Sequence, residues 1–120
     1  MIESILRAAG KITGVVGTIE YRIAGQVKPA ANTTPESLDL ARLAAAVSDA
    51  GGTHLISEVS SHALALGRVD GFFFHTAVLT NVTRDHLDFH ETMEAYTAAK
   101  RLLFVPRRWA RPEMGRVERR

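Results

Sequence analysis

Residues 72–79 read Phe-Phe-Phe-His-Thr-Ala-Val-Leu, and residues 81–90 read Asn-Val-Thr-Arg-Asp-His-Leu-Asp-Phe-His. A largely apolar run of this length beside a polar segment is typical of a buried strand in a parallel sheet. Open sheets of this kind bind ligands just beyond the carboxyl ends of their strands. The polar segment, with its acids, histidines and arginine, is therefore the first candidate for chemistry.

Helix and strand patterns alternate on both sides of this stretch. Apolar residues recur at helical spacing in some segments and β-branched residues gather in others. The expected elements, in order, are a helix at 2–9, a strand at 12–19, a hairpin or irregular excursion at 21–28, a helix from Thr33 or Thr34 to Gly51-Gly52 with the stripe Leu40, Leu43, Ala44 and Val47, a strand at 54–59, a helix at 61–66, a strand at 72–79 and a helix at 93–104 capped by Thr92. This order predicts an α/β fold, a three-layer parallel sheet flanked by helices with right-handed crossovers.

The composition is that of a soluble globular protein, since 46% of the 120 residues are hydrophobic and 23% are charged. The chain has no cysteine, which excludes disulfides and thiolate metal sites. No apolar stretch reaches the roughly 18 residues that a membrane span needs, and the first residues lack the pattern of a signal peptide. We expect a cytoplasmic protein with no membrane partner.

The charge is concentrated at one end of the sequence. Residues 105–120 contain six arginines and two glutamates, a local charge of +4, which leaves −2 for residues 1–104. We expect one domain over residues 1–104 and a basic, disordered tail over residues 105–120. No aromatic platform or nucleic-acid module accompanies the tail, so no nucleic-acid partner is expected.

Two residues stand at the ends of expected neighbouring strands. Glu58 lies at the end of one strand and His86 follows the next, so adjacent strand ends would bring them together as ligands of Mg²⁺. Taken singly, Glu58 could instead cap a turn and His86 could be an ordinary loop histidine. An unrelated metal-dependent hydrolase built on Asp85, His86 and His90 is a further alternative, although no glutamate follows the first histidine as in zinc proteases.

Small polar residues precede the expected central helix, at Asn32-Thr33-Thr34-Pro35. Free N–H groups at a helix start favour anions, although plain capping explains the same pattern. Lys100 lies within the last expected helix and would by default be a solvated lysine.

Five motifs in the same order closely resemble the central domain of the Mur ligase family. They are residues 32–37, 58–64, 67–69, 80–90 and 98–100. The resemblance implies a P-loop-type Mur ligase central, ATP-binding domain over residues 1–104. The family's phosphate loop, Gly-x-x-Gly-Lys-Thr/Ser, has no counterpart in these residues, so the chain alone is expected to be inactive.

The resemblance also implies a function, an ATP-dependent amide ligase of peptidoglycan synthesis. Such an enzyme adds diaminopimelate or lysine to UDP-N-acetylmuramoyl-L-alanyl-D-glutamate through an acyl phosphate. A non-catalytic muramoyl-peptide-binding fragment is the alternative. The roles implied are metal ligands at Glu58, His86 and carbamylated Lys100, catalytic residues at Lys100 and His86, contacts to the UDP-muramoyl-dipeptide at Asn32, Thr33, Thr34, Ser60 and Arg68, and the nucleotide side of the site at Asn81 and Asp85.

Overall fold

A computed structural model describes residues 1–83 and 87–105 of the chain. These residues divide into two compact units, one from Met1 to Asp70 and one that begins at Gly71. The expected basic tail beyond Val105 lies outside the described residues, as do Arg84, Asp85 and His86.

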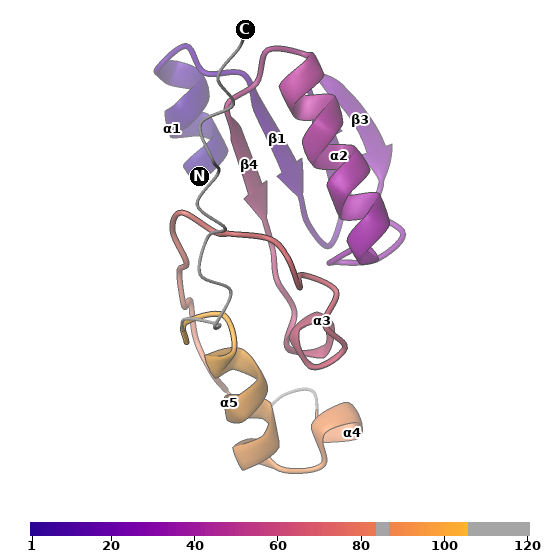
Figure 1. Cartoon of the computed structure of the whole chain (residues 1–120). Helices are drawn as coiled ribbons and strands as arrows, with labels where there is room; N and C mark the ends of the chain where they lie inside the picture. Colours follow the sequence, from indigo (N-terminus) through magenta and orange to yellow (C-terminus); the bar gives the residue numbers. More distant parts are fainter. Residues whose placement is uncertain (84–86, 106–120) are drawn as a thin grey trace, which may run out of the picture. The chain divides into compact units, whose positions relative to one another are not determined.

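The first unit contains a four-stranded sheet in the order β3-β2-β1-β4 (Figure 1). The strands are β1 (Thr13–Val16), β2 (Glu20–Ile23), β3 (Gln26–Pro29) and β4 (His54–Ser57). β1 pairs parallel with β4 and antiparallel with β2, which pairs antiparallel with β3. The predicted α/β class and the hairpin are confirmed. The sheet is mixed, however, because the hairpin adds two antiparallel strands to the one parallel pair.

A helix covers each face of this sheet. Residues paired directly across strands point to the same face, so Val15 and its partner Arg22 share one face. On that face Arg22 Nη2 lies 2.6 Å from Glu3 Oε2 of α1 (Ile2–Ala8). Gly14 faces the other way, toward Val47 of α2 (Ser37–Asp49). The unit is therefore a three-layer arrangement of helix, sheet and helix, as predicted.

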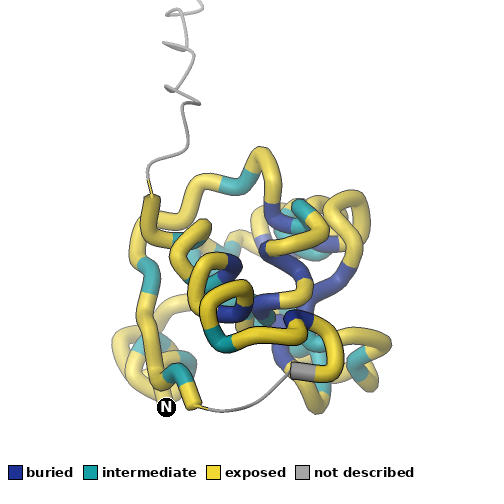
Figure 2. The backbone as a smooth tube through the Cα atoms, turned by 90° about the horizontal axis from the view of Figure 1, so that it is seen from below, coloured by how far each residue is buried: buried dark blue, intermediate teal, exposed yellow. Residues whose placement is uncertain are grey.

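The core of the first unit lies between α2 and the sheet. Leu40 and Val47 of α2 are 1% and 3% exposed, and Val16 of β1 is fully buried. Leu43 and Ala44 are half-buried, so the predicted apolar stripe of the helix is confirmed. The dark-blue buried backbone in Figure 2 is short beside the yellow exposed backbone, which shows how small the buried core is.

The predicted start of α2 is wrong by three or four residues. The helix begins at Ser37, and Glu36 is the capping position without a side-chain hydrogen bond. Two physical reasons account for the shift. A proline disfavours helical geometry in the residue before it, here Thr34, and the Thr34 hydroxyl binds a different part of the chain. The following helix, α3 (Ser61–Ala65), begins where predicted.

Residues 72–79 do not form the predicted buried strand. They contain no strand residue, and Phe73, Val78 and Leu79 are 64%, 63% and 54% exposed. A strand exists only where a neighbouring strand accepts and donates its main-chain hydrogen bonds, and this run has no such neighbour among the described residues. Apolar composition alone cannot reveal whether that neighbour is present.

The described part of the second unit contains two helices. The predicted last helix is present as α5 (Met93–Arg101), although it ends three residues before the predicted Phe104, and the Thr92 hydroxyl accepts a 3.1 Å hydrogen bond from the Ala95 N–H as its cap. A short helix, α4 (Leu87–His90), was not predicted. Its four residues are too few to produce a periodic apolar pattern.

Candidate functional site

Three of the predicted substrate residues of the first unit, Thr34, Ser60 and Arg68, meet in one hydrogen-bonded network centred on Thr34. Its side chain is only 1% exposed. Thr34 Oγ1 donates to the Glu58 carbonyl at 2.9 Å and accepts from the Ser60 N–H at 3.0 Å. A single hydroxyl thus joins the loop before α2 to the loop after β4, although the two are more than twenty residues apart in sequence.

Arg68 joins the same network from the segment after α3. Its Nη1 donates to the Thr34 carbonyl at 3.2 Å, and its Nη2 lies 2.8 Å from Glu36 Oε1. The arginine side chain is 19% exposed and Glu36 is 62% exposed. Arg68 Nε is buried and has no hydrogen-bond partner among the described residues. The guanidinium is therefore held in place, and an anion could compete with the solvent-exposed Glu36 for it.

Glu58 stands at the end of β4, beside the end of β1. Its N–H donates to the Val16 carbonyl at 2.8 Å and so extends the parallel pairing by one residue. Glu58 Oε2 accepts two hydrogen bonds from Thr18, one from the N–H at 3.1 Å and one from Oγ1 at 2.7 Å. The carboxylate is oriented although Glu58 is exposed.

Thr18 is a site residue that sequence reasoning missed. It lies near the end of the strand predicted at 12–19, and Glu58 lies near the end of the strand predicted at 54–59. Neighbouring parallel strands end at the same edge of a sheet, where ligands bind. A polar residue such as Thr18 at the end of a predicted strand could therefore have indicated a site residue. Only the pairing of β1 with β4 places Thr18 against Glu58.

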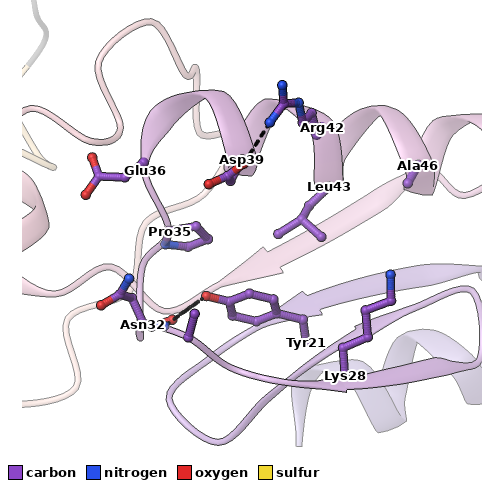
Figure 3. A pocket seen from close by; sticks show the side chains of 10 residues that line it. Tyr21, Lys28, Asn32, Pro35, Glu36, Asp39, Arg42, Leu43 and Ala46 are labelled. Atoms are coloured by element: carbon purple, nitrogen blue, oxygen red, sulfur yellow. Dashed lines mark hydrogen bonds and ion pairs between the residues drawn. The ribbon is translucent and has the colours of Figure 1, made fainter.

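Asn32 and Thr33 form the exposed end of the loop before α2. Tyr21 Oη donates to the Asn32 carbonyl at 2.5 Å and lies 3.3 Å from the Asn32 N–H, which donates back to it. Beside them is a pocket of about 400 Å³ between the hairpin and α2 (Figure 3). In that view Lys28 rises from the hairpin toward α2, whereas the Tyr21 ring extends toward Asn32.

Ser60 has a local structural role in this conformation. Its Oγ accepts a 3.1 Å hydrogen bond from the Ala63 N–H and so caps α3. Ala63 and Leu64 of that short helix are buried. The cap therefore fixes the loop that carries both Glu58 and Ser60.

The remaining predicted site residues belong to the second unit. Lys100 lies on α5 and is half-buried, and this burial lowers its pKa below the usual lysine value of 10.5. Asn81 is exposed, whereas Asp85 and His86 lie outside the described residues. The predicted meeting of Glu58, His86 and Lys100 therefore stays a prediction. No group of three metal-binding side chains occurs within residues 1–83 and 87–105.

His90 packs against two aromatic rings. It is 8% exposed, and its ring centroid lies 4.8 Å from that of Phe89 and 5.5 Å from that of Tyr96. Asp85 and His86, the other two residues of the alternative metal-dependent hydrolase, lie outside the described residues, so that alternative stays a prediction.

Among the described residues, no helix has both the length and the apolar character required to cross a membrane.

Sequence comparison identifies the family. The model of the Mur ligase middle domain matches residues 1–108. This chain belongs to the Mur ligase family. The match covers the five motifs, and the predicted resemblance is confirmed.

The chain is also similar to curated members of the family. It is 64% identical over 104 residues to the UDP-N-acetylmuramoyl-L-alanyl-D-glutamate–2,6-diaminopimelate ligase of Solibacter usitatus, covering 87% of this chain and 21% of that protein. Ligases of the same name from Geobacillus kaustophilus and Geobacter metallireducens are 52% and 47% identical over 105 residues, each covering 88% of this chain and 22% and 20% of the relative. The chain thus spans about a fifth of the length of these relatives.

Proposed function

We propose that this chain is the middle-domain part of an ATP-dependent ligase that adds diaminopimelate to UDP-N-acetylmuramoyl-L-alanyl-D-glutamate in peptidoglycan synthesis. The observation that carries the proposal is the network in which Thr34 joins Glu58, Ser60 and Arg68. The names of the similar ligases favour diaminopimelate over lysine as the amino acid added. A cytoplasmic location follows from the nucleotide substrates of such an enzyme.

The loop before α2 and Arg68 are proposed to hold the muramoyl-dipeptide. Asn32 is exposed and Thr33 half-exposed, so both can contact a ligand, whereas the buried Thr34 shapes the loop beneath them. The Arg68 guanidinium suits a carboxylate or phosphate group because it presents several donors in one plane. Ser60 would contact the same ligand from the loop after β4, and Asn81 and Asp85 would contribute to the nucleotide side.

Glu58 has the chemistry of a Mg²⁺ ligand. Thr18 occupies its Oε2, and its Oε1 accepts no hydrogen bond from the described residues. A free carboxylate oxygen is the ligand type that Mg²⁺ prefers. His86 and carbamylated Lys100 would complete the set, as the family resemblance implies. Bound Mg²⁺ would offset the negative charge that builds up on the phosphates of ATP and of the acyl phosphate.

The environment of Lys100 supports carbamylation. A lowered pKa raises the fraction of neutral amine at a given pH. The neutral amine attacks carbon dioxide, a nitrogen–carbon bond forms as one carbon–oxygen π bond breaks, and one proton passes from the nitrogen to water. The product is a carbamate, which is an anionic oxygen ligand in place of a cation. We propose that Lys100 is modified in this way.

We propose that the isolated chain does not turn over ATP. The 120 residues contain no Gly-x-x-Gly-Lys-Thr/Ser segment, whose N–H groups and lysine cradle the phosphates in nucleotide-binding loops. Substrate binding without turnover is the expected behaviour of the chain. Mg²⁺-dependent ATP turnover by these residues alone would contradict it.

Calorimetric titration with the UDP-muramoyl-dipeptide tests the substrate site. Arg68→Lys keeps the charge and loses the planar fork, so we expect roughly tenfold weaker binding than in the unmodified chain. Arg7→Lys on α1 is the matched control and should bind like the unmodified chain. Absence of heat at millimolar ligand, or equal affinity in both variants, would reject the proposed site.

A further inference from the structure

Thr18 holds one oxygen of the Glu58 carboxylate with two donors. The N–H lies 3.1 Å and the hydroxyl 2.7 Å from Oε2. Hydrogen bonds to an ionised acceptor are among the stronger ones in proteins. Two donors from one residue therefore fix the direction of a side chain that solvent would otherwise leave free, and Oε1 remains as the open oxygen.

Gly17 lies beside the Glu58 carboxylate. A Cβ atom at position 17 would lie 3.4 Å from both Cδ and Oε1 of Glu58. That is an ordinary van der Waals distance, so the carboxylate lies against the main chain between β1 and Thr18. Gly17 and Thr18, the two residues after β1, thus form the contact surface for the Glu58 side chain, which we call the Glu58 seat.

The seat is connected to the loop before α2. Thr33 Oγ1 lies 3.2 Å from Thr18 Oγ1 and donates to it, and Thr18 donates onward to Glu58. Thr34 meanwhile binds the Glu58 carbonyl. The loop touches Glu58 at its side chain through Thr18 and at its main chain directly, so a ligand that orders the loop also orders the carboxylate.

We propose that Thr18 is a positioning residue that aims the Glu58 carboxylate at a divalent cation and couples cation binding to occupancy of the Asn32–Thr34 loop. By linkage, each ligand strengthens the binding of the other by the same factor. The identities of the two ligands, Mg²⁺ and the muramoyl-dipeptide, rest on the proposed function. The hydrogen bonds by which Thr18 orients Glu58 do not depend on the proposed function.

Mn²⁺ titration of the full chain, followed by electron paramagnetic resonance, tests the positioning role. Thr18→Val removes the hydroxyl, and we expect roughly tenfold weaker Mn²⁺ binding. Thr18→Ser restores the hydroxyl and should return the affinity to within about twofold of the unmodified chain. Thr53→Val, at an exposed threonine far from Glu58 in the sheet register, is the matched control and should leave the affinity unchanged.

The coupling is tested by repeating the titration with the UDP-muramoyl-dipeptide present. The dipeptide should raise Mn²⁺ affinity in the unmodified chain and in Thr53→Val, and this gain should disappear in Thr33→Val. Unchanged affinity in Thr18→Val, or no recovery in Thr18→Ser, would overturn the positioning role. A gain that persists in Thr33→Val would overturn the coupling.

A separate arm distinguishes failure of the inference from failure of the proposed function. If Glu58→Gln binds Mn²⁺ as the unmodified chain does, Glu58 is not the cation ligand and that part of the proposed function fails. Crystal structures of Thr18→Val and Thr18→Ser then decide the positioning role alone. A Glu58 side chain that keeps its direction in Thr18→Val would refute it, and one displaced only in that variant would support it.

Discussion

Thr34 shows how one buried hydroxyl can hold a site together. It is almost fully buried, accepts from the Ser60 N–H and donates to the Glu58 carbonyl. The carbonyl has a second donor in Ser57 Oγ at 3.3 Å, whereas within the described part of the chain the Ser60 N–H donates only to Thr34 Oγ1. The loop carrying Ser60 therefore depends on this hydroxyl.

Thr34→Val should destabilise the chain. The variant keeps the shape of the side chain but leaves the Ser60 N–H without its acceptor, so we expect a loss of about 1–3 kcal/mol in the free energy of unfolding. Urea denaturation of the full chain measures it. Thr34→Ser keeps the hydroxyl and should lose much less, and the exposed Thr53→Val should lie within about 0.5 kcal/mol of the unmodified chain. Equal stability of the serine and valine variants would contradict the role of the hydroxyl.

In buffer free of carbon dioxide, where Lys100 is an unmodified amine, it should titrate below the usual lysine value of 10.5. Burial lowers its pKa because removal from water disfavours the charged amine. Between the lowered pKa and 10.5, the unfolded chain binds more protons than the folded chain, so stability should rise with pH across that window. NMR of the lysine Cε groups, with Lys100→Met to assign the signal, measures the pKa. The rise of stability with pH should be absent in Lys100→Met. A Lys100 pKa at or above 10.5 would contradict the expectation.

At the scale of the elements, the contact between α2 and β1 is set by a glycine. A Cβ atom on Gly14 would lie 2.3 Å from Val47 Cγ2, which is closer than atoms can approach. The helix can therefore lie on the sheet at this height only because position 14 has no side chain. The apolar stripe of α2 predicts a helix that packs on a sheet, but the required glycine becomes visible only when both elements are placed.

Gly14→Ala should push α2 away from the sheet and cost about 1–3 kcal/mol in the free energy of unfolding. Val47→Ala removes the clashing methyl group and leaves a small cavity. The double variant should be more stable than the sum of the two single losses predicts, by about 0.5–3 kcal/mol. Urea denaturation of all four proteins measures this coupling. Strict additivity would show that the two residues do not clash.

Several elements could be predicted because their signals are local. The hairpin has Ala24 and Gly25 at φ 49° and 86°, which suits the tight turn that joins its strands. Thr92 and Ser60 precede helices that they cap. The strand predicted at 72–79 failed because a strand also needs a partner, and no local pattern reports one.

At the scale of the whole molecule, the chain consists of two units with a long apolar run at the start of the second. Phe73, Val78 and Leu79 are each more than half exposed. Contiguous exposed apolar surface favours association in water. We expect the isolated chain to associate as its concentration rises.

The double substitution Phe73→Gln and Val78→Gln should weaken that association. Sedimentation velocity over a range of concentrations measures it, and unfolding stability should change by less than about 0.5 kcal/mol because both side chains are exposed. Thr80→Gln with Thr83→Gln, at exposed polar positions nearby, is the matched control. Association that is equal in both double variants would show that the apolar run is not its cause.

The sequence by itself determined the family, the α/β class and most helices, because periodicity, capping residues and ordered motifs are written along the chain. The tertiary structure alone decided that β1 lies beside β4, and this pairing places Thr18 on Glu58. It also decided that Thr34 holds a distant loop rather than capping α2. Hydrogen bonds between segments far apart in sequence depend on which elements become neighbours, and only packing settles that choice.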